Sequence, residues 1–478
     1  MRYSLILAAF SLVHYSCNQE SNESVPAGLR LSGQITNPLD SLVIIYHDKR
    51  DDTLTLAEDG TFSGYIELLK NGRLSLKNGD ERTAFYAVPG DSLHISFDGS
   101  QFDESIVYSG TSPGSSTFLA AKYLQDENIS GSFPTDRLYL FSPSRFLEVS
   151  DSLSKLRTDA LELGKSTIHE ELYTSLKLEN LYTWARSLKI YPEYAAWFQQ
   201  NDSIEIPENF MSSIADVPFE NSDALDVPAY QRYAEEQLHA EVNLRFEARD
   251  QSPEDMDYMK EMLICADSLF TKQAVKEYFL NTAMKMTVDY FGTRDLTEQF
   301  AFFSSKSSNK EHLEELEKEY ASWAHLAAGK VAPDFSYKNL EGSLVSLSDF
   351  KGKVVYVDVW ATWCGPCRGE IPSLHALSEE MKNEDIVFMS VSVDDSQEDW
   401  EKMVTEDGLD GVQVITGTGW KSKITEDYKV SGIPRFMLID KDGKIVSADA
   451  PRPSENEKIV SMMMGALNNT ETLAVKLN

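Results

Sequence analysis

The chemistry in this sequence centres on two cysteines separated by two residues, in the order Cys364-Gly365-Pro366-Cys367. An apolar β run over residues 354–359 precedes the pair, and a helical stretch to about residue 381 follows it. Free N–H groups and the macrodipole at the start of that helix favour a thiolate at Cys364. A thiolate attacks disulfides, and a second cysteine one turn away can resolve the mixed disulfide. The spacing therefore predicts a redox-active dithiol.

The elements that must hold this pair follow a regular order downstream. Residues 386–393 and 436–439 are apolar enough for buried strands, and residues 440–443 form a hairpin turn. A helix is predicted over residues 420–428. Ser454 and Glu457 have the spacing of a capping box for a last helix ending near residue 467.

Several motifs then give a resemblance. The Trp360–Cys367 segment (WATWCGPC), Pro372, and Gly432-Ile433-Pro434 before a hairpin resemble a thioredoxin fold. The Ala-Pro-Asp-Phe opening at 332–335, residues 347–353 and residues 368–372 are similar to the TlpA/ResA-like group of exported thiol–disulfide oxidoreductases. This resemblance covers about residues 330–470. The blocks ahead of it resemble the arrangement in Bacteroidetes-type thioredoxin-like lipoproteins.

The resemblance implies roles for individual residues. Cys364 is the attacking cysteine and Cys367 the resolving one. Pro434 is a cis-proline that faces the pair, and the backbone of Ile433 pairs with an extended substrate segment. The substrate-binding surface also includes the residues flanking and separating the cysteines, Trp363, Gly365 and Pro366.

Two carboxylates are candidates for the proton acceptor of Cys367. Asp358 lies where thioredoxin has its buried acid, and Glu370 matches the acid of the ResA-like proteins. Thioredoxin pairs its acid with a lysine on the next strand, but residues 387–393 contain no lysine. The choice between the two acids stays open at this point. His375, two turns along the helix, is expected to be solvated.

The rest of the chain divides into blocks of different period. Residues 1–24 form a signal peptide and tether, and residues 25–110 carry short strands typical of a sandwich or barrel. Residues 111–325 have helical periodicity, with a break expected at Pro192. Residues 326–478 form the thioredoxin-like domain. The predicted fold is multidomain: a small all-β domain, a central all-α region and a C-terminal α/β thioredoxin fold.

The first 17 residues have the features of an export signal. Arg2 precedes an apolar stretch that is too short to span a bilayer, and the stretch ends at Ser16-Cys17. A small residue followed by cysteine resembles a lipobox, so Cys17 is the expected lipidation site. The predicted location is the periplasm or cell envelope, with attachment to the membrane only through a lipid anchor.

Charge and cysteine number exclude several classes of protein. Lys and Arg total 44 and Asp and Glu total 77, which gives a formal charge of −33. Such a chain has no electrostatic footprint for nucleic acid. Four cysteines in 478 residues are too few for a disulfide scaffold. Of these, Cys265 lies in an apolar helical stretch and is expected to be buried and inert.

Other functions are weaker matches to the same residues. A peroxidatic cysteine would need a proline and a hydroxyl residue at set distances before it, which Cys364 lacks. A structural zinc site would need a second ligand pair. Two alternatives stay open: a disulfide oxidase or isomerase, and a surface lipoprotein that binds partners through the first 325 residues.

The sequence thus predicts an exported protein disulfide oxidoreductase, with reduction as the favoured direction. It needs no metal or organic cofactor, because the Cys364–Cys367 disulfide carries the electrons. Expected partners are disulfide-containing exported proteins and a membrane thiol electron donor. The resemblance adds apocytochrome c as one substrate class, although the chain has no haem-related motif.

Overall fold

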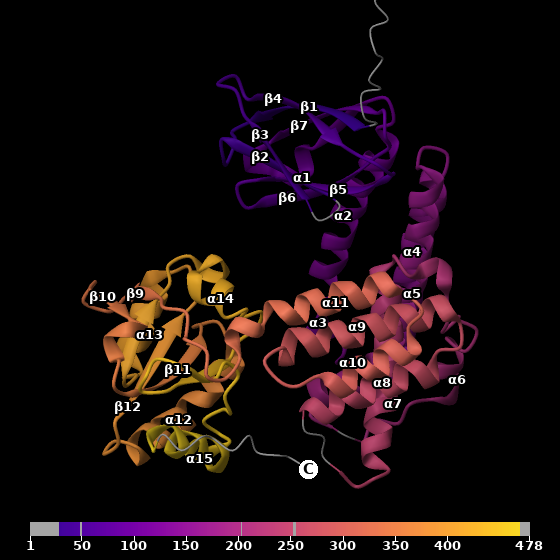
Figure 1. Ribbon diagram of the computed structural model, residues 1–478. Coiled ribbons are helices and arrows are strands. Elements are labelled where there is room, and N and C mark those ends of the chain that lie inside the picture. Colours follow the sequence, from indigo (N-terminus) through magenta and orange to yellow (C-terminus); the bar gives the residue numbers. More distant parts are fainter. Residues whose placement is uncertain (1–27, 48–49, 202, 252–254, 469–478) are drawn as a thin grey trace, which may run out of the picture. The chain divides into compact units, whose positions relative to one another are not determined.

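The computed structural model describes residues 28–47, 50–201, 203–251 and 255–468. The residues predicted to form a signal peptide and tether, Cys17 among them, lie outside this range. Strands occupy the N-terminal part, helices the central part and an α/β domain the C-terminal part, as the fold class predicted (Figure 1). None of the helices in the described ranges is both long and apolar enough to cross a bilayer.

The chain clusters into two compact units. One unit runs to Val217 and includes Asp226–Tyr233, and the other contains Pro218–Leu225 and everything from Ala234 onward. The domain boundaries expected from the sequence stay predictions, as does the independent folding of each domain.

The N-terminal strands form two four-stranded sheets, in the orders β4-β1-β7-β8 and β3-β2-β5-β6. Alternate residues of these strands point inward, and side chains such as Leu31, Val43 and Ile95 share one apolar core. This is the sandwich arrangement expected from strand spacing. The strands are β1 Gly28–Thr36, β2 Leu42–His47, β3 Arg50–Thr55, β4 Thr61–Glu67, β5 Gly72–Asn78, β6 Glu81–Ala87, β7 Ser92–Asp98 and β8 Val107–Gly110.

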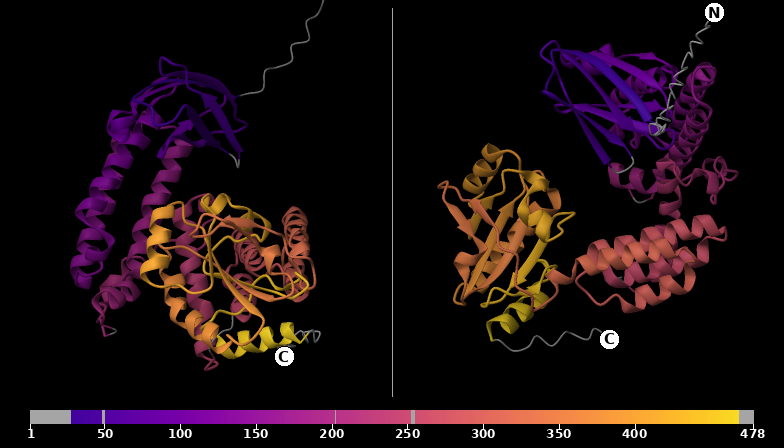
Figure 2. Two further views of the ribbon diagram at one scale, coloured as in Figure 1. Left: turned by 90° about the vertical axis from the view of Figure 1, so that its left-hand side faces the viewer. Right: turned by 45° about the horizontal axis from the view of Figure 1, so that its top comes forward.

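The central region is helical between residues 114 and 322, and neighbouring helices such as α8 and α9 pack side by side (Figure 2). The helices before residue 217 are α1 Phe102–Ser105, α2 Gly114–Ser132, α3 Thr135–Leu138, α4 Pro143–Gly164, α5 Glu170–Gln199 and α6 Glu208–Ser212. They are followed by α7 Pro228–Glu247, α8 Asp255–Leu269, α9 Gln273–Phe291, α10 Thr297–Lys306 and α11 Lys310–Ser322.

The expected break at Pro192 is wrong, because α5 continues through it to Gln199. Proline removes one intrahelical hydrogen bond, and its ring crowds the carbonyl of the preceding turn. Leu188, Tyr191 and Ala195 on either side of it are fully buried, and their packing offsets that loss.

The C-terminal domain contains a seven-stranded sheet in the order β10-β9-β13-β12-β11-β14-β15. β11, β12 and β13 are parallel, whereas β14 and β15 are antiparallel to their neighbours. The strands are β9 Ser336–Lys338, β10 Leu344–Ser346, β11 Val354–Trp360, β12 Ile386–Ser392, β13 Val412–Ile415, β14 Arg435–Ile439 and β15 Ile445–Ser447.

Four α-helices accompany the sheet: α12 Gly365–Glu380, α13 Gln397–Glu406, α14 Lys423–Asp427 and α15 Asn456–Leu467. α12 and α15 pack on one face, where Leu377 and Ile459 join Tyr356 in a common core. The helix predicted over residues 420–428 is in fact interrupted. Ser422 is extended, and its buried hydroxyl pairs with that of Thr425, so only a short turn precedes α14.

The register of the sheet brings three separated segments to one edge. β11 is buried along its whole length and ends directly before the cysteine loop. Val359 near its end pairs with Arg435 of β14, so Pro434 lies beside the start of that loop. On the other side, Asp358 pairs with Ser390, and Ser390 pairs with Gln413. The sheet therefore positions the cysteine loop, the proline turn and a row of polar residues together.

Candidate active site

The two cysteines lie at the first turn of α12. Cys364 is the N-cap residue, and its sulfur accepts a hydrogen bond from the backbone N–H of Cys367 at 3.1 Å. The two residues form a disulfide with their Cα atoms 5.3 Å apart. Gly365 and Pro366 form the start of the helix, where the missing N–H of proline costs nothing. A thiolate at Cys364 would thus face the positive end of the helix.

The loop before the cysteines is held by a buried carboxylate that sequence reasoning missed. Asp394, 2% exposed, accepts hydrogen bonds from the backbone N–H of Thr362 at 2.9 Å and from its hydroxyl at 2.8 Å. The hydroxyl of Ser392 donates a third, at 2.7 Å. These bonds anchor the loop two residues before Cys364. In the sequence, their only sign was an acidic residue at the end of an apolar strand.

The two tryptophans of the motif have opposite surroundings. Trp360 is buried at the end of β11, whereas Trp363 is 60% exposed beside Cys364. Trp363 lies near a second exposed indole, Trp420, with ring centroids 6.4 Å apart. The Ile433–Pro434 peptide bond is cis, and Ile433 and Pro434 are both half-buried. Apolar side chains are thus exposed beside Cys364.

Asp358 is buried in β11 with few polar contacts. Its side chain accepts one long hydrogen bond, from the hydroxyl of Ser390 at 3.5 Å. Burial is the main cause that raises its pKa, to about 7; the Ser390 bond opposes this effect and the negative charge of Glu370 adds to it. A carboxyl with this pKa can both accept and release a proton near neutral pH.

Glu370 has a different set of contacts. Its carboxylate accepts hydrogen bonds from the backbone N–H of Ser454 at 3.1 Å and from the Ser454 hydroxyl at 2.9 Å. The capping box predicted for Ser454 and Glu457 is therefore wrong: α15 begins at Asn456, and Ser454 binds Glu370 instead. Glu370 fastens α12 to the segment before α15.

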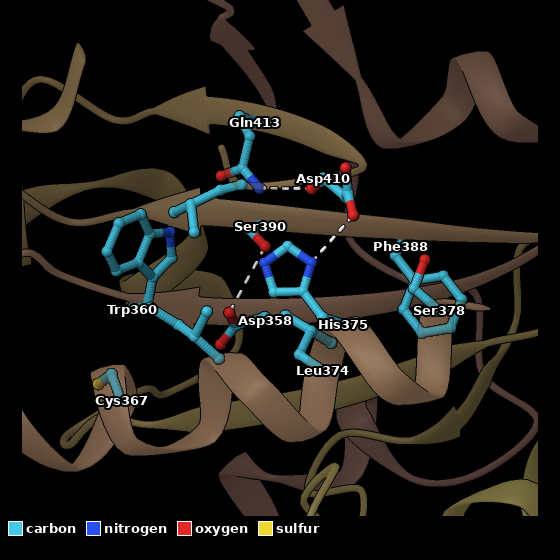
Figure 3. A pocket seen from close by; sticks show the side chains of 12 residues that line it. Asp358, Trp360, Cys367, Leu374, His375, Ser378, Phe388, Ser390, Asp410 and Gln413 are labelled. Carbon is cyan, nitrogen blue, oxygen red and sulfur yellow. Dashed lines mark hydrogen bonds and ion pairs between the residues drawn. The ribbon is translucent and has the colours of Figure 1, made fainter. Parts of the chain in front are cut away.

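A pocket behind Cys367 is lined by only one of the two acids. Asp358 and Cys367 both line it, and Glu370 does not (Figure 3). The lining also includes Ser390 and Gln413 from the neighbouring strands and His375 from α12. His375 is partly exposed, and its Nδ1 lies 2.9 Å from the Asp410 carboxylate. Sequence reasoning missed Ser390 and Gln413, which only the strand register places in line with Asp358, and Asp410, which lies in the loop before β13.

Comparison with known proteins places this geometry in a family. Residues 327–462 match the redoxin family. The thiol–disulfide oxidoreductase ResA of a Bacillus cereus strain is 34% identical over 128 residues, which are 27% of this chain and 72% of ResA. The ResA of Bacillus anthracis is 35% identical over 127 residues and is also covered to 72%. The chain belongs to the ResA-like thiol–disulfide oxidoreductases.

A solved relative matches the same part of this ResA-like chain. It is a thiol–disulfide oxidoreductase from Bacteroides vulgatus, 40% identical, and the match covers 30% of this chain and 99% of that one with a TM-score of 0.28. The family assignment rests on the ResA sequence identity. It applies to the C-terminal domain, which holds the cysteine pair and the pocket.

Burial of Asp358 makes the stability of this ResA-like domain depend on pH. Because its pKa in the folded state, about 7, lies above the ordinary value of 3.8, the folded state favours the protonated acid. Its contribution to stability is fully present below about pH 4 and is lost as pH rises to about 7, by at most roughly 4 kcal/mol.

We therefore expect Asp358→Asn to raise the melting temperature of the oxidised chain more at pH 8 than at pH 5. Thermal unfolding at the two pH values measures this difference. Asp395→Asn, which changes an exposed neighbour of Asp394, is the control and should show no such growth with pH. A gain equal at both pH values would contradict the raised pKa.

Proposed function

We propose that this chain is an exported oxidoreductase that reduces disulfides in other exported proteins. The observation that carries the proposal is the pairing of a helix-capping cysteine, Cys364, with a second cysteine that opens on a buried acid. The family has thiol–disulfide chemistry. The shared pocket of Cys367 and Asp358 supports a resolving role for Cys367 and an attacking role for Cys364.

In the reducing direction the thiolate of Cys364 attacks one sulfur of a substrate disulfide. A mixed disulfide forms and the other substrate sulfur leaves as a thiolate. Asp358 takes the proton of Cys367, whose sulfur then attacks Cys364 and releases the second substrate thiolate. Two electrons pass to the substrate, and the chain returns to the Cys364–Cys367 disulfide.

A donor must then reduce that disulfide again, because the couple stores only two electrons. We propose a membrane thiol protein as the donor and disulfide-containing exported proteins, apocytochrome c among them, as substrates. Export and lipidation at Cys17 are supported by the N-terminal sequence pattern alone. The exposed Trp363, with Gly365, Pro366 and Ile433, would contact the substrate segment.

The direction of electron flow is tested by the reduction potential of the Cys364/Cys367 couple, measured by equilibration in graded thiol buffers followed by thiol trapping. We expect a value near that of thioredoxin, about −270 mV. A value near about −120 mV, typical of a strong oxidant, would contradict reduction and favour a disulfide donor.

The cysteine roles predict asymmetric trapping. Cys367→Ser cannot resolve the mixed disulfide and should accumulate covalent complexes with partners, whereas Cys364→Ser should accumulate almost none. Non-reducing electrophoresis of envelope extracts from cells expressing each variant compares the two. Equal accumulation by both variants would contradict the assignment.

The choice of proton acceptor is tested by two amide variants of similar size. Asp358→Asn should slow disulfide reduction at pH 7 by roughly a hundredfold, the lower range for removal of a general base. Glu370→Gln is the matched control, and should have a small effect because Glu370 binds Ser454 rather than facing the pocket. In the unaltered chain, the rate between about pH 5 and 9 should depend on a group whose pKa is near 7. Only Asp358→Asn should lose this dependence. If Glu370→Gln alone loses it, the roles are reversed.

A further inference from the structure

A line of polar side chains crosses the sheet behind the cysteines. Asp358 on β11, Ser390 on β12 and Gln413 on β13 are direct partners across adjacent parallel strands. Their exposed fractions are 8%, 5% and 7%, and all three line the pocket behind Cys367. Burying three polar groups side by side on one sheet face is costly unless each finds a partner.

The line has an unused acceptor at its far end. The amide nitrogen of Gln413 donates to the backbone carbonyl of Asp410 at 2.7 Å, but its buried Oε1 has no protein donor among the described residues. The indole N–H of Trp360, which lines the same pocket, is also buried without an acceptor in the described chain. Water is small enough to satisfy both groups, and a pocket lined by several polar side chains can hold it.

His375 connects this pocket to the surface. Its imidazole lines the pocket from α12, and its side chain is 34% exposed. Its Nδ1 contacts the Asp410 carboxylate (Figure 3). The side chain of Asp410 is 71% exposed. The charged groups that face the pocket are Asp358 from β11, His375 from α12 and Asp410 from the loop before β13; Glu370 acts on Asp358 from outside the lining.

We propose that Ser390, the Gln413 amide and His375 form the path by which Asp358 passes its proton to solvent. This inference rests on the proposed function, because a proton path matters only if Cys367 is deprotonated in each cycle. After Asp358 takes the proton of Cys367, the proton moves through the Ser390 hydroxyl and water held at Gln413 to the free nitrogen of His375. His375 then releases a proton to bulk water, and Asp358 returns to its carboxylate form.

The chemistry of each group suits this order. A hydroxyl both donates and accepts, an amide oxygen orients water without taking a proton, and imidazole exchanges protons near neutral pH. The contact of Nδ1 with the Asp410 carboxylate fixes the ring so that the other nitrogen is left for the pocket. His375 is a positioning residue here, since it acts on the cysteines only through Asp358.

The test is steady-state reduction of oxidised glutathione by the full chain in dilute buffer at about pH 7, with dithiothreitol regenerating the cysteine pair in each cycle and the rate without the chain subtracted. His375→Gln should slow the reaction by about tenfold, a modest share of the effect of a positioned acid or base. Added imidazole should restore the rate, because a small buffer can carry the proton from the pocket mouth. The reduction potential should stay that of the unaltered chain.

Ser390→Ala interrupts the path inside the pocket and gives the second variant. It should slow the reaction by a similar factor but regain little with imidazole, since the break lies beyond the reach of the buffer. His94→Gln, a change at a histidine on β7 in the N-terminal sandwich, is the matched control and should match the unaltered chain at every imidazole concentration.

The possible results distinguish a failure of the proton path from a failure of the proposed function. Unaltered rates in both pocket variants, or slow rates in His375→Gln that imidazole does not restore, would overturn the path. A changed reduction potential in His375→Gln would do so too, since it would show an electrostatic effect on the cysteines. If the unaltered chain itself fails to reduce glutathione disulfide, the proposed function fails and not the path alone.

Discussion

The burial of one carboxyl group, that of Asp358, sets the conditions for the rest of the active site. An acid in the middle of an apolar strand destabilises the domain whenever it is ionised. Its single long hydrogen bond from Ser390 offsets little of that cost, so its pKa rises to about 7. The same burial places the acid on the pocket that Cys367 lines. Burial thus lowers the stability of the fold near neutral pH and gives the pocket a carboxyl group that is suited to the proposed role of proton acceptor.

The first turn of α12 gives the two cysteines different surroundings. Cys364 caps the helix, so the helix N-terminus favours its thiolate without a nearby base. Cys367, inside the first turn, opens on the pocket and on Asp358. The loop before them is fixed by the Thr362–Asp394 hydrogen bonds, and α12 is fastened at its other side by Glu370 and Ser454. Rigid elements thus hold the two sulfur atoms for the proposed exchange, in which two S–S bonds form and two break.

Sequence alone was enough for the cysteine pair, its strand-to-helix setting and the three-part fold class, because each depends on local pattern. Asp358 was also recognisable, since a lone acid in an apolar strand needs a reason. The partners of Asp358 were not, because Ser390 and Gln413 are set beside it only by strand register. The contact of Ser454 with Glu370 spans 84 residues and replaced a capping box that local spacing favoured.

The most direct test of this account is the titration of the Asp358 carboxyl carbon by ¹³C NMR in the oxidised full chain, with Asp358→Asn to assign the signal. We expect a midpoint near 7, because burial raises the pKa of this carboxyl. A midpoint near about 4, the ordinary value for aspartate, would mean that Asp358 is ionised throughout the neutral range. The acid could then not collect the proton of Cys367, and the proposed mechanism would be contradicted at its first proton transfer.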